Sequence, residues 1–277
     1  MVSNKSIYKR AFVMIWFGIF SSLVFAQEKE KPQQAAVMEL AKATQNPVAD
    51  MVTIPVQFNW YTGGGLGSQT LSQYLFQPVL PLSISKDWNL ISRTIIPIMN
   101  IPQDSGSRLK GIGDIQEQIF FSPKEAKKVV WGIGPVFSFP TATINEIATG
   151  QFAVGPTGVV LFMPGKWVVG AVANNLWRFA GSESTTAISF FFVQPFINYN
   201  FKGGWAISTS PSITANWSAK SGQQWTVPLG LGVSKITHIG GQSLSIAMQY
   251  YHDAIHPDNA GADQVRISVS LLFPRKK

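Results

Sequence analysis

Residues 205–217 read WAISTSPSITANW, and every second side chain from Trp205 to Trp217 is apolar or weakly polar. The side chains between them, from Ala206 to Asn216, are small and mostly polar. Because successive side chains of a strand point to opposite sides, this alternation gives one largely apolar face and one polar face. A strand of this length, rising about 3.3 Å per residue and tilted by about 40°, spans roughly 30 Å. The stretch therefore predicts a strand that crosses a membrane, with tryptophans closing both ends of its apolar face.

The same alternation recurs along the chain, for example over residues 52–60, 225–233 and 265–273. We count twelve such segments, an even number, as bacterial single-chain barrels have. The sequence therefore predicts an all-β fold, a transmembrane antiparallel up-and-down β-barrel of about 12 strands. The predicted strands cover residues 51–62, 70–84, 88–100, 111–122, 128–140, 151–163, 166–178, 187–201, 204–217, 223–235, 242–253 and 263–274.

One predicted strand departs from the pattern at a single position. Glu117 falls on the same face as Ile115, Ile119 and Phe121, which are apolar. A charged group on a lipid-facing wall is costly, so we expect a bulge or a shifted phase near Glu117.

The connections between the predicted strands alternate in length. Short turns near residues 85–87, 123–127, 164–166, 202–204 and 239–241 alternate with generally longer loops near residues 63–69, 101–110, 141–150, 180–186, 219–223 and 254–262. Short periplasmic turns and longer outer loops are typical of outer-membrane barrels with both termini inside. Tryptophans predict two aromatic girdles, with Trp88, Trp131, Trp167 and Trp205 near the periplasm and Trp60, Trp177 and Trp217 near the outside. A soluble β-sandwich, the alternative fold, does not require tryptophans at a fixed depth.

Composition favours lipid contact through strands rather than through helices. Charged residues make up 13% of the 277 residues and hydrophobic ones 45%. After residue 26, however, no apolar run approaches the roughly 20 residues that a spanning helix needs. The chain has no cysteine, which excludes disulfides and thiolate metal sites.

The first 26 residues have the form of a secretory signal peptide. Lys5, Lys9 and Arg10 precede an apolar stretch, and a small-residue cleavage site ends at Ala26. Without these three basic residues the chain has 19 basic against 14 acidic residues, a net charge of +5. The charge is too small and too dispersed to indicate a nucleic-acid partner. We therefore expect an exported protein located in the cell outer membrane of a Gram-negative envelope.

Three segments are predicted: a signal peptide at residues 1–26, a periplasmic linker with a short helix at 27–50, and the barrel at 51–274. Val37, Leu40 and Ala41 share one face of the alanine-rich stretch, so the helix is amphipathic. It plugs the periplasmic mouth, binds a partner or hangs free, and the sequence leaves these three possibilities open.

The inward faces of the predicted strands carry many Gly, Ser, Ala and Thr residues, which leaves space inside a twelve-stranded wall and favours a conduit. Arg93 and Arg266 either tune a pore towards anions or pair with acids such as Asp114, and pairing is the favoured interpretation. Residues 145–149 fold inward as a constriction or form an ordinary outer loop, and the loop is favoured. The candidate pore-lining residues are Arg93, Asp114, Gln194, Asn198, Ser208, Ser210, Ser212 and Arg266.

An enzymatic or metal site has little support in the sequence. Some outer-membrane lipid hydrolases use a histidine and a serine close together on the outer wall, but none of His238, His252 and His256 stands two residues from a serine. We predict no catalytic residue, no cofactor and no enzymatic activity. The histidines and aspartates of residues 252–263 have a spacing that fits a cation, but solvated loop residues are the favoured interpretation, so no metal is predicted.

From about Leu40 to Pro274 the chain resembles a family of Gram-negative outer-membrane β-barrels. The family is labelled either as phenol-degradation (MetA-pathway) components or as generic transporters, and is sometimes mislabelled neuromedin U. The matching stretches are residues 40–49 (LAKATQNPVA), 87–97 (DWNLISRTIIP), 131–135 (WGIGP), 165–177 (GKWVVGAVANNLW), 205–217 and 225–228 (WTVP).

This resemblance implies an outer-membrane location and a transport role, with distant similarity to long-chain fatty-acid channels. We therefore expect a channel or passive transporter for small solutes, including apolar or aromatic ones. The alternatives are a structural or adhesive barrel with a closed lumen and a lipid-modifying enzyme. The expected partners are outer-membrane lipid and lipopolysaccharide, the barrel-assembly machinery and a small-molecule solute, with no nucleic acid.

Overall fold

The computed structural model describes residues 33–103, 105–125, 128–183 and 186–274. The predicted signal peptide lies outside these residues. A helix at residues 33–44 is followed by strands only, apart from two short 3-10 turns. The strands are β1 (Met51–Thr62), β2 (Leu71–Phe76), β3 (Val79–Ser83), β4 (Trp88–Pro102), β5 (Arg108–Ile112), β6 (Ile115–Pro123), β7 (Val129–Phe139), β8 (Gln151–Phe162), β9 (Trp167–Gly181), β10 (Ser189–Asn200), β11 (Trp205–Thr209), β12 (Ile213–Asn216), β13 (Trp225–Ile239), β14 (Gln242–Ile255) and β15 (Asp263–Pro274).

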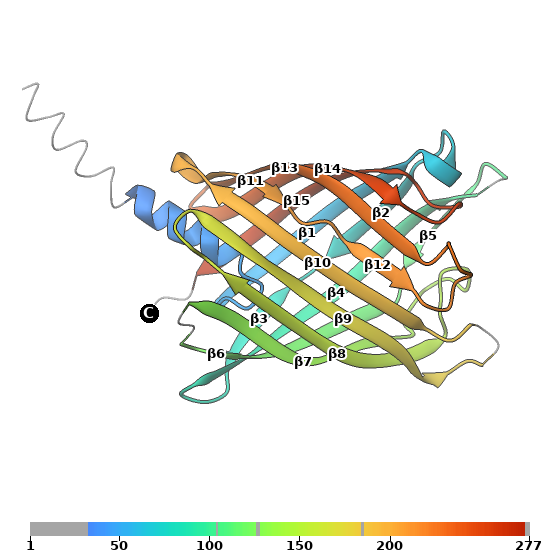
Figure 1. The fold of residues 1–277 in the computed structure, drawn as a ribbon, viewed down its shortest axis with the longest axis horizontal. Helices are drawn as coiled ribbons and strands as arrows, with labels where there is room; N and C mark the ends of the chain where they lie inside the picture. The colour runs from blue at the N-terminus through green and yellow to red at the C-terminus, as the bar shows by residue number, and fades with distance from the viewer. Residues whose placement is uncertain (1–32, 104, 126–127, 184–185, 275–277) are drawn as a thin grey trace, which may run out of the picture.

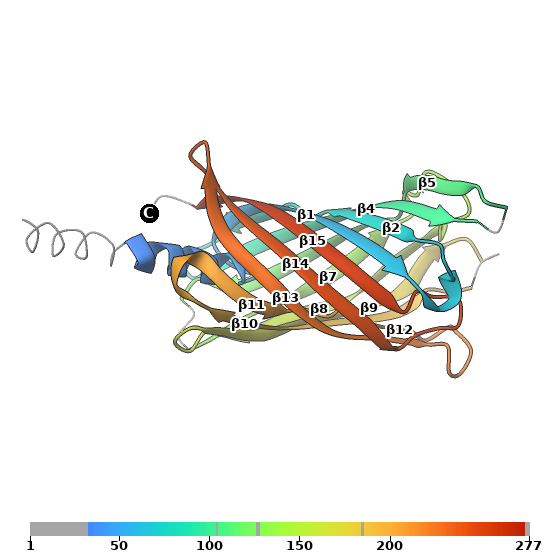
Figure 2. The ribbon, with the colours of Figure 1, turned by 90° about the horizontal axis from the view of Figure 1, so that it is seen from above.

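These segments form one closed antiparallel barrel (Figures 1 and 2). Three pairs, β2 with β3, β5 with β6 and β11 with β12, are each a single strand interrupted for two or three residues, so the barrel has twelve strands. The wall closes where β1 pairs with β15 over twelve residues, from Met51 opposite Pro274 to Thr62 opposite Asp263. The predicted twelve-stranded barrel is confirmed, and the observed strand limits lie close to the predicted ones.

The two ends of the barrel differ. The short turns, the helix and the end of β15 lie at one end, here called the turn end, and the longer connections lie at the other, the loop end (Figure 1). In the part of the chain that the structure describes, no helix is long and apolar enough to cross a membrane.

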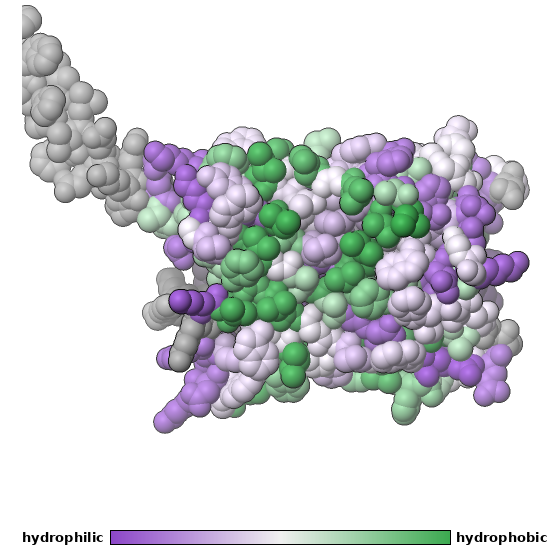
Figure 3. All heavy atoms as spheres, viewed as in Figure 1, coloured by the Kyte–Doolittle hydropathy of each residue, from purple (hydrophilic) through white to green (hydrophobic). Residues whose placement is uncertain are grey.

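The outer wall is apolar because the strand alternation sends one row of side chains outward. Leu229, Leu231 and Met248, for example, are about 60% exposed (between 58% and 62%). Figure 3 shows the apolar residues across the middle of the barrel and the hydrophilic ones mainly at its ends. Six of the seven girdle tryptophans are exposed and Trp60 is partly exposed, so all of them face outward. This wall suits contact with lipid.

The bulge or shifted phase that we expected near Glu117 does not occur at that residue. Glu117 keeps the outward phase of β6, opposite Thr94 on β4, and the register of β6 with β4 does not shift. Ser92 and Thr94 on β4 each donate a hydrogen bond of 2.6 Å to its carboxylate. The irregularity lies just before, at residues 113–115, where three residues face only Ile96 and Pro97 of β4. The neighbouring hydroxyls therefore accommodate the carboxylate without a change of phase.

The wall is also interrupted at residues 210–212, between β11 and β12. Pro211 has no N–H, and the sheet ladder to both neighbouring strands stops around it. The Ser210 N–H donates instead to the Tyr251 hydroxyl at 2.9 Å, and the Thr209 hydroxyl donates to the Gly230 carbonyl at 2.6 Å. Side-chain hydroxyls thus replace the strand partners at this point.

The predicted N-terminal helix is confirmed and lies at the turn end (Figure 1). Ala41 and Met51 are buried against Ile236 and Leu272 of the barrel, with Val37 and Leu40 packed alongside. Gly204 accommodates this packing, because a Cβ there would lie 3.0 Å from the Val37 side chain. The apolar helical face read from the sequence is therefore the face that docks on the barrel.

Candidate functional site

A cavity of about 330 Å³ lies in the middle of the lumen. Amide side chains make up half of its polar lining residues: Gln57, Gln73, Gln77, Gln116, Gln118, Asn174, Gln194 and Gln264. Two arginines, Arg93 and Arg266, and two aspartates, Asp114 and Asp253, supply charge. Phe190 and Phe192 are among the apolar lining residues. The cavity is thus polar with an aromatic side, and its charges are confined to four residues.

A second cavity, of about 610 Å³, lies at the loop end and adjoins the first. The two share five lining residues: Gln73, Pro97, Asp114, Gln116 and Phe190. Glu146, Ile147 and Thr149 also line it, so part of residues 145–149 borders the mouth of the lumen. The two cavities form a route from the loop end to the centre of the barrel.

Arg266 is the charged lumen residue most removed from solvent, with 2% of its surface exposed. Its guanidinium donates to the Ser210 carbonyl at 2.8 Å, the Ser212 hydroxyl at 3.1 Å and the Asn59 Oδ1 at 3.3 Å. It also lies 4.9 Å from the centre of the Tyr251 ring. All these partners are neutral, so none of them offsets the positive charge of the arginine.

Arg93 likewise has neutral partners. It donates to the Gln77 Oε1 at 2.5 Å and to the Gln118 Oε1 at 3.5 Å. Asp114 instead accepts hydrogen bonds from Ala142 and Thr149, and so fixes the loop over the mouth. The expected pairing of the arginines with Asp114 is therefore wrong. Within the described ranges, neither arginine makes an ion pair.

Below the arginines the lumen becomes apolar. Ile91 and Phe120, each two residues nearer the turn end than Arg93 and Gln118, belong to a buried cluster: Val48, Ile91, Phe120, Val130, Val159, Leu161, Val168, Val172 and Phe196. Eight of these residues come from the strands and Val48 from the segment after the helix. Gly132 leaves room for Val48, because a Cβ at Gly132 would lie 3.3 Å from the Val48 side chain.

The N-terminal segment also makes polar contacts with the wall. Gln45 and Asn200 exchange two hydrogen bonds, of 2.9 and 3.0 Å. On the far side of Val48 lies a third cavity, of about 600 Å³, lined by residues 46 and 48–50 and by barrel residues such as Lys124 and Lys128. The segment therefore lies between the central lumen and the turn end, which is the plug position among the three possibilities that the sequence leaves open.

The structure brings five of the eight predicted pore-lining residues to the central cavity: Arg93, Asp114, Gln194, Ser212 and Arg266. Ser210 holds Arg266, whereas Asn198 and Ser208 are buried in the wall without lining this cavity. The sequence interpretation missed most of the amides, Phe190, Phe192 and Asp253. The sequence feature that could have identified them is their position in the inward-facing row of a strand. Gln249, Tyr251 and Asp253, for example, are alternate residues of β14 and are all buried.

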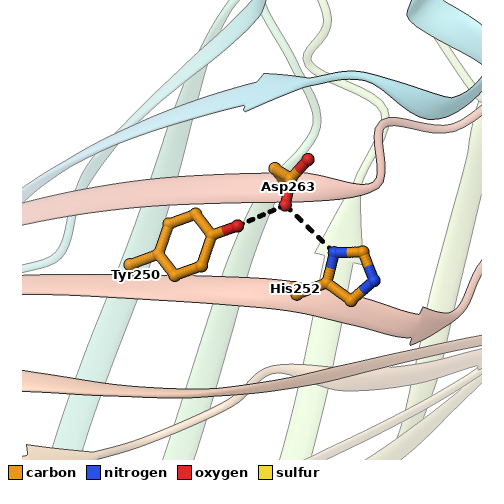
Figure 4. Close-up of polar contacts among 3 residues, drawn as sticks. All are labelled: Tyr250, His252 and Asp263. Carbon is orange, nitrogen blue, oxygen red and sulfur yellow. Dashed lines mark hydrogen bonds and ion pairs between the residues drawn. The ribbon is translucent and has the colours of Figure 1, made fainter.

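A separate polar cluster lies on the outer face near the loop end (Figure 4). The Tyr250 hydroxyl donates to the Asp263 Oδ1 at 2.5 Å, and the His252 Nδ1 lies 3.0 Å from the same oxygen. Asp253 points into the lumen, away from these three. Within the described ranges no three His, Asp or Glu side chains converge as metal ligands, and His252 has no hydrogen bond to a serine or threonine. The cluster thus lacks the hydroxyl nucleophile of a lipid hydrolase.

The sequence matches no protein-family model and no curated protein. Solved structures do share its fold. The COG4313 outer membrane channel from Pseudomonas putida F1 is 12% identical, with a TM-score of 0.62 over 81% of this chain and 96% of that one. The NanC porin is 9% identical, with a TM-score of 0.50 over 80% of this chain and all of that one. The CymD monoaromatic hydrocarbon channel is 8% identical, with a TM-score of 0.48 over 87% and 92%.

At these identities the likeness concerns the fold alone. A closed antiparallel barrel with an apolar outer wall, exposed tryptophans and a polar lumen is what the hydrocarbon core of an outer membrane requires. The chain is therefore an integral β-barrel protein of the outer membrane.

Proposed function

We propose that this protein is an outer-membrane channel for small solutes, including apolar or aromatic ones. The observation that carries the proposal is the pair of adjoining cavities between the loop end and the centre of the lumen. A purely structural barrel has no need of such a route. Channel proteins such as the COG4313 channel and the NanC porin have the same fold, which agrees with this role.

The route is sealed at one point. A solute in the central cavity meets the apolar cluster around Val48 before it reaches the turn end, which we assign to the periplasm. Hydrated ions are disfavoured in an apolar constriction, whereas an apolar or aromatic solute is tolerated there. Passage then requires the N-terminal segment to move, and the size of the central cavity restricts the solutes to small molecules.

Planar-bilayer conductance tests this proposal. The mature chain, residues 27–277, is compared with a chain that lacks residues 27–50. We expect rare, small current steps from the mature chain and larger, frequent ones from the shortened chain. Silence from both, together with no swelling of proteoliposomes in small sugars or aromatic alcohols, would contradict a channel and leave a closed structural barrel. Release of fatty acid from labelled lipid would instead indicate an enzyme.

A further inference from the structure

Two guanidinium groups in the central cavity have unused donors. An arginine has five N–H groups. Arg93 uses two of them, on Gln77 and Gln118. Arg266 makes its contacts through Nε and both terminal nitrogens, which leaves about two N–H groups for another acceptor. Because a buried positive charge without a carboxylate partner is costly, an anion in the cavity would be stabilised there.

The two acids of the cavity do not fulfil this role. Asp114 accepts hydrogen bonds from Ala142 and Thr149. Asp253 lies four residues nearer the loop end on β14 than Gln249, which pairs with Arg266. Four residues of a tilted strand correspond to about 10 Å along the barrel axis. Asp114 likewise precedes Gln118, the contact of Arg93, by four residues on the loop-end side of β6. Each acid thus lies nearer the loop end than the arginine on the neighbouring strands.

The space above the arginines has an apolar side. Ile95 lies two residues above Arg93 on the inward row of β4, and Phe190 and Phe192 line the same cavity from β10. Two residues below Arg93 on the same row, the apolar cluster begins with Ile91. A ligand that matches both zones has one negative group directed toward the turn end and a compact apolar or aromatic body directed toward the loop end.

We propose that the central cavity binds small aromatic monocarboxylates, whose carboxylate accepts hydrogen bonds from Arg93 and Arg266 while the ring packs near Phe190 and Phe192. This inference rests on the proposed function and narrows its substrate class. The carboxylate suits guanidinium donors because two parallel N–H groups match its two oxygens. The cavity volume of about 330 Å³ accommodates a single ring with its carboxylate.

The test is calorimetric titration of the mature chain in nanodiscs with three single-ring probes of similar size, benzoate, benzyl alcohol and benzylammonium, with empty nanodiscs as the blank. We expect benzoate to bind at least about tenfold more tightly than the other two, as hydrogen bonds to a charged group predict. Arg93→Gln and Arg266→Gln are each expected to weaken benzoate binding about tenfold and to leave benzyl alcohol binding unchanged.

Arg108→Gln is the matched control, because Arg108 also donates to neutral groups, on Asn100 and Thr70, but is exposed and lies outside the cavity. It is expected to leave benzoate binding unchanged. Equal binding of the three probes, tighter binding of benzylammonium, or no binding at all would overturn the proposal, and this comparison needs no variant that has to fold. Proteoliposome swelling separates the two claims: permeation without selective benzoate binding sinks this inference alone, and selective binding without permeation sinks the channel alone.

Discussion

The side-chain amides of Gln45 and Asn200, 155 residues apart in sequence, face each other and exchange two hydrogen bonds. One amide belongs to the N-terminal segment and the other to the turn end of β10. This pair is the polar counterpart of the apolar contact made by Val48, and together they hold the segment in the mouth of the barrel.

Gln45→Ala is expected to loosen the plug. Loss of two amide hydrogen bonds costs about 2 kcal/mol, which raises the undocked fraction roughly thirtyfold. The measurement is the frequency of open-channel bursts in planar bilayers. Glu39→Ala, at an exposed position on the helix that precedes Gln45, is the control and is expected to leave the frequency unchanged. An unchanged frequency in Gln45→Ala would show that the amide pair does not hold the plug.

Substitutions of Glu117, Ser92 and Thr94 are expected to affect stability non-additively, because the two hydroxyls bond to the carboxylate. Removing both hydroxyls leaves the lipid-facing carboxylate without donors and lowers the free energy of unfolding by about 3 kcal/mol. Replacing all three residues, by Ser92→Ala, Thr94→Ala and Glu117→Leu together, raises it by about 1–3 kcal/mol above the wild type. Unfolding by guanidinium chloride in lipid vesicles, followed by tryptophan fluorescence, measures the free energy of unfolding of the double and the triple variant. Effects that simply add would contradict the coupling.

Tyr251→Phe is expected to destabilise the interruption at residues 210–212. It removes the only hydrogen-bond acceptor of the Ser210 N–H within the described ranges, at a cost of about 1–3 kcal/mol. Amide hydrogen exchange then becomes faster at residues 209–213 and stays the same in β1. Tyr199→Phe on the outer wall is the control, since its ring packs on Trp167. Exchange that is already fast in the wild type would argue against this anchoring.

The closure of the barrel can be tested through its register. Val56 on β1 lies opposite Val269 on β15. Because the natural chain has no cysteine, Val56→Cys with Val269→Cys creates a single disulfide on mild oxidation, visible as a shift on denaturing gels. Val56→Cys with Leu271→Cys, two residues out of register, is expected to form it far more slowly. The reverse order would refute the register of the closing pair.

Strand positions were predictable because membrane-crossing strands repeat with a period of two and are long. The apolar cluster in the turn-end half of the lumen could not be predicted in this way. Val129 and Val130, Val159 and Val160, and Val168 and Val169 are apolar on both faces, so alternation cannot tell which side of the wall is dry. Only the strand register shows that one valine of each pair meets the apolar cluster.

Charged residues were the least predictable, because their environment depends on neighbouring strands. The hydroxyls that serve Glu117 lie on β4, some 25 residues away in sequence. Likewise, the neutral amides around Arg93 come from the β2–β3 connection and from β6. Periodicity places such a side chain on a face, but it does not identify the partner across the strand, and so it favoured an ion pair with Asp114.

The pairing of β1 with β15 constrains the order in which the barrel can assemble. Its pairing joins residue 51 to residue 274, so the wall cannot close until the whole chain has been delivered. The docking site of the N-terminal helix includes Ile236 on β13 and Leu272 on β15. This site is therefore complete only when the last strands are in place, although the helix precedes all of them in sequence. We expect the turn end of a newly inserted barrel to stay open until this contact forms.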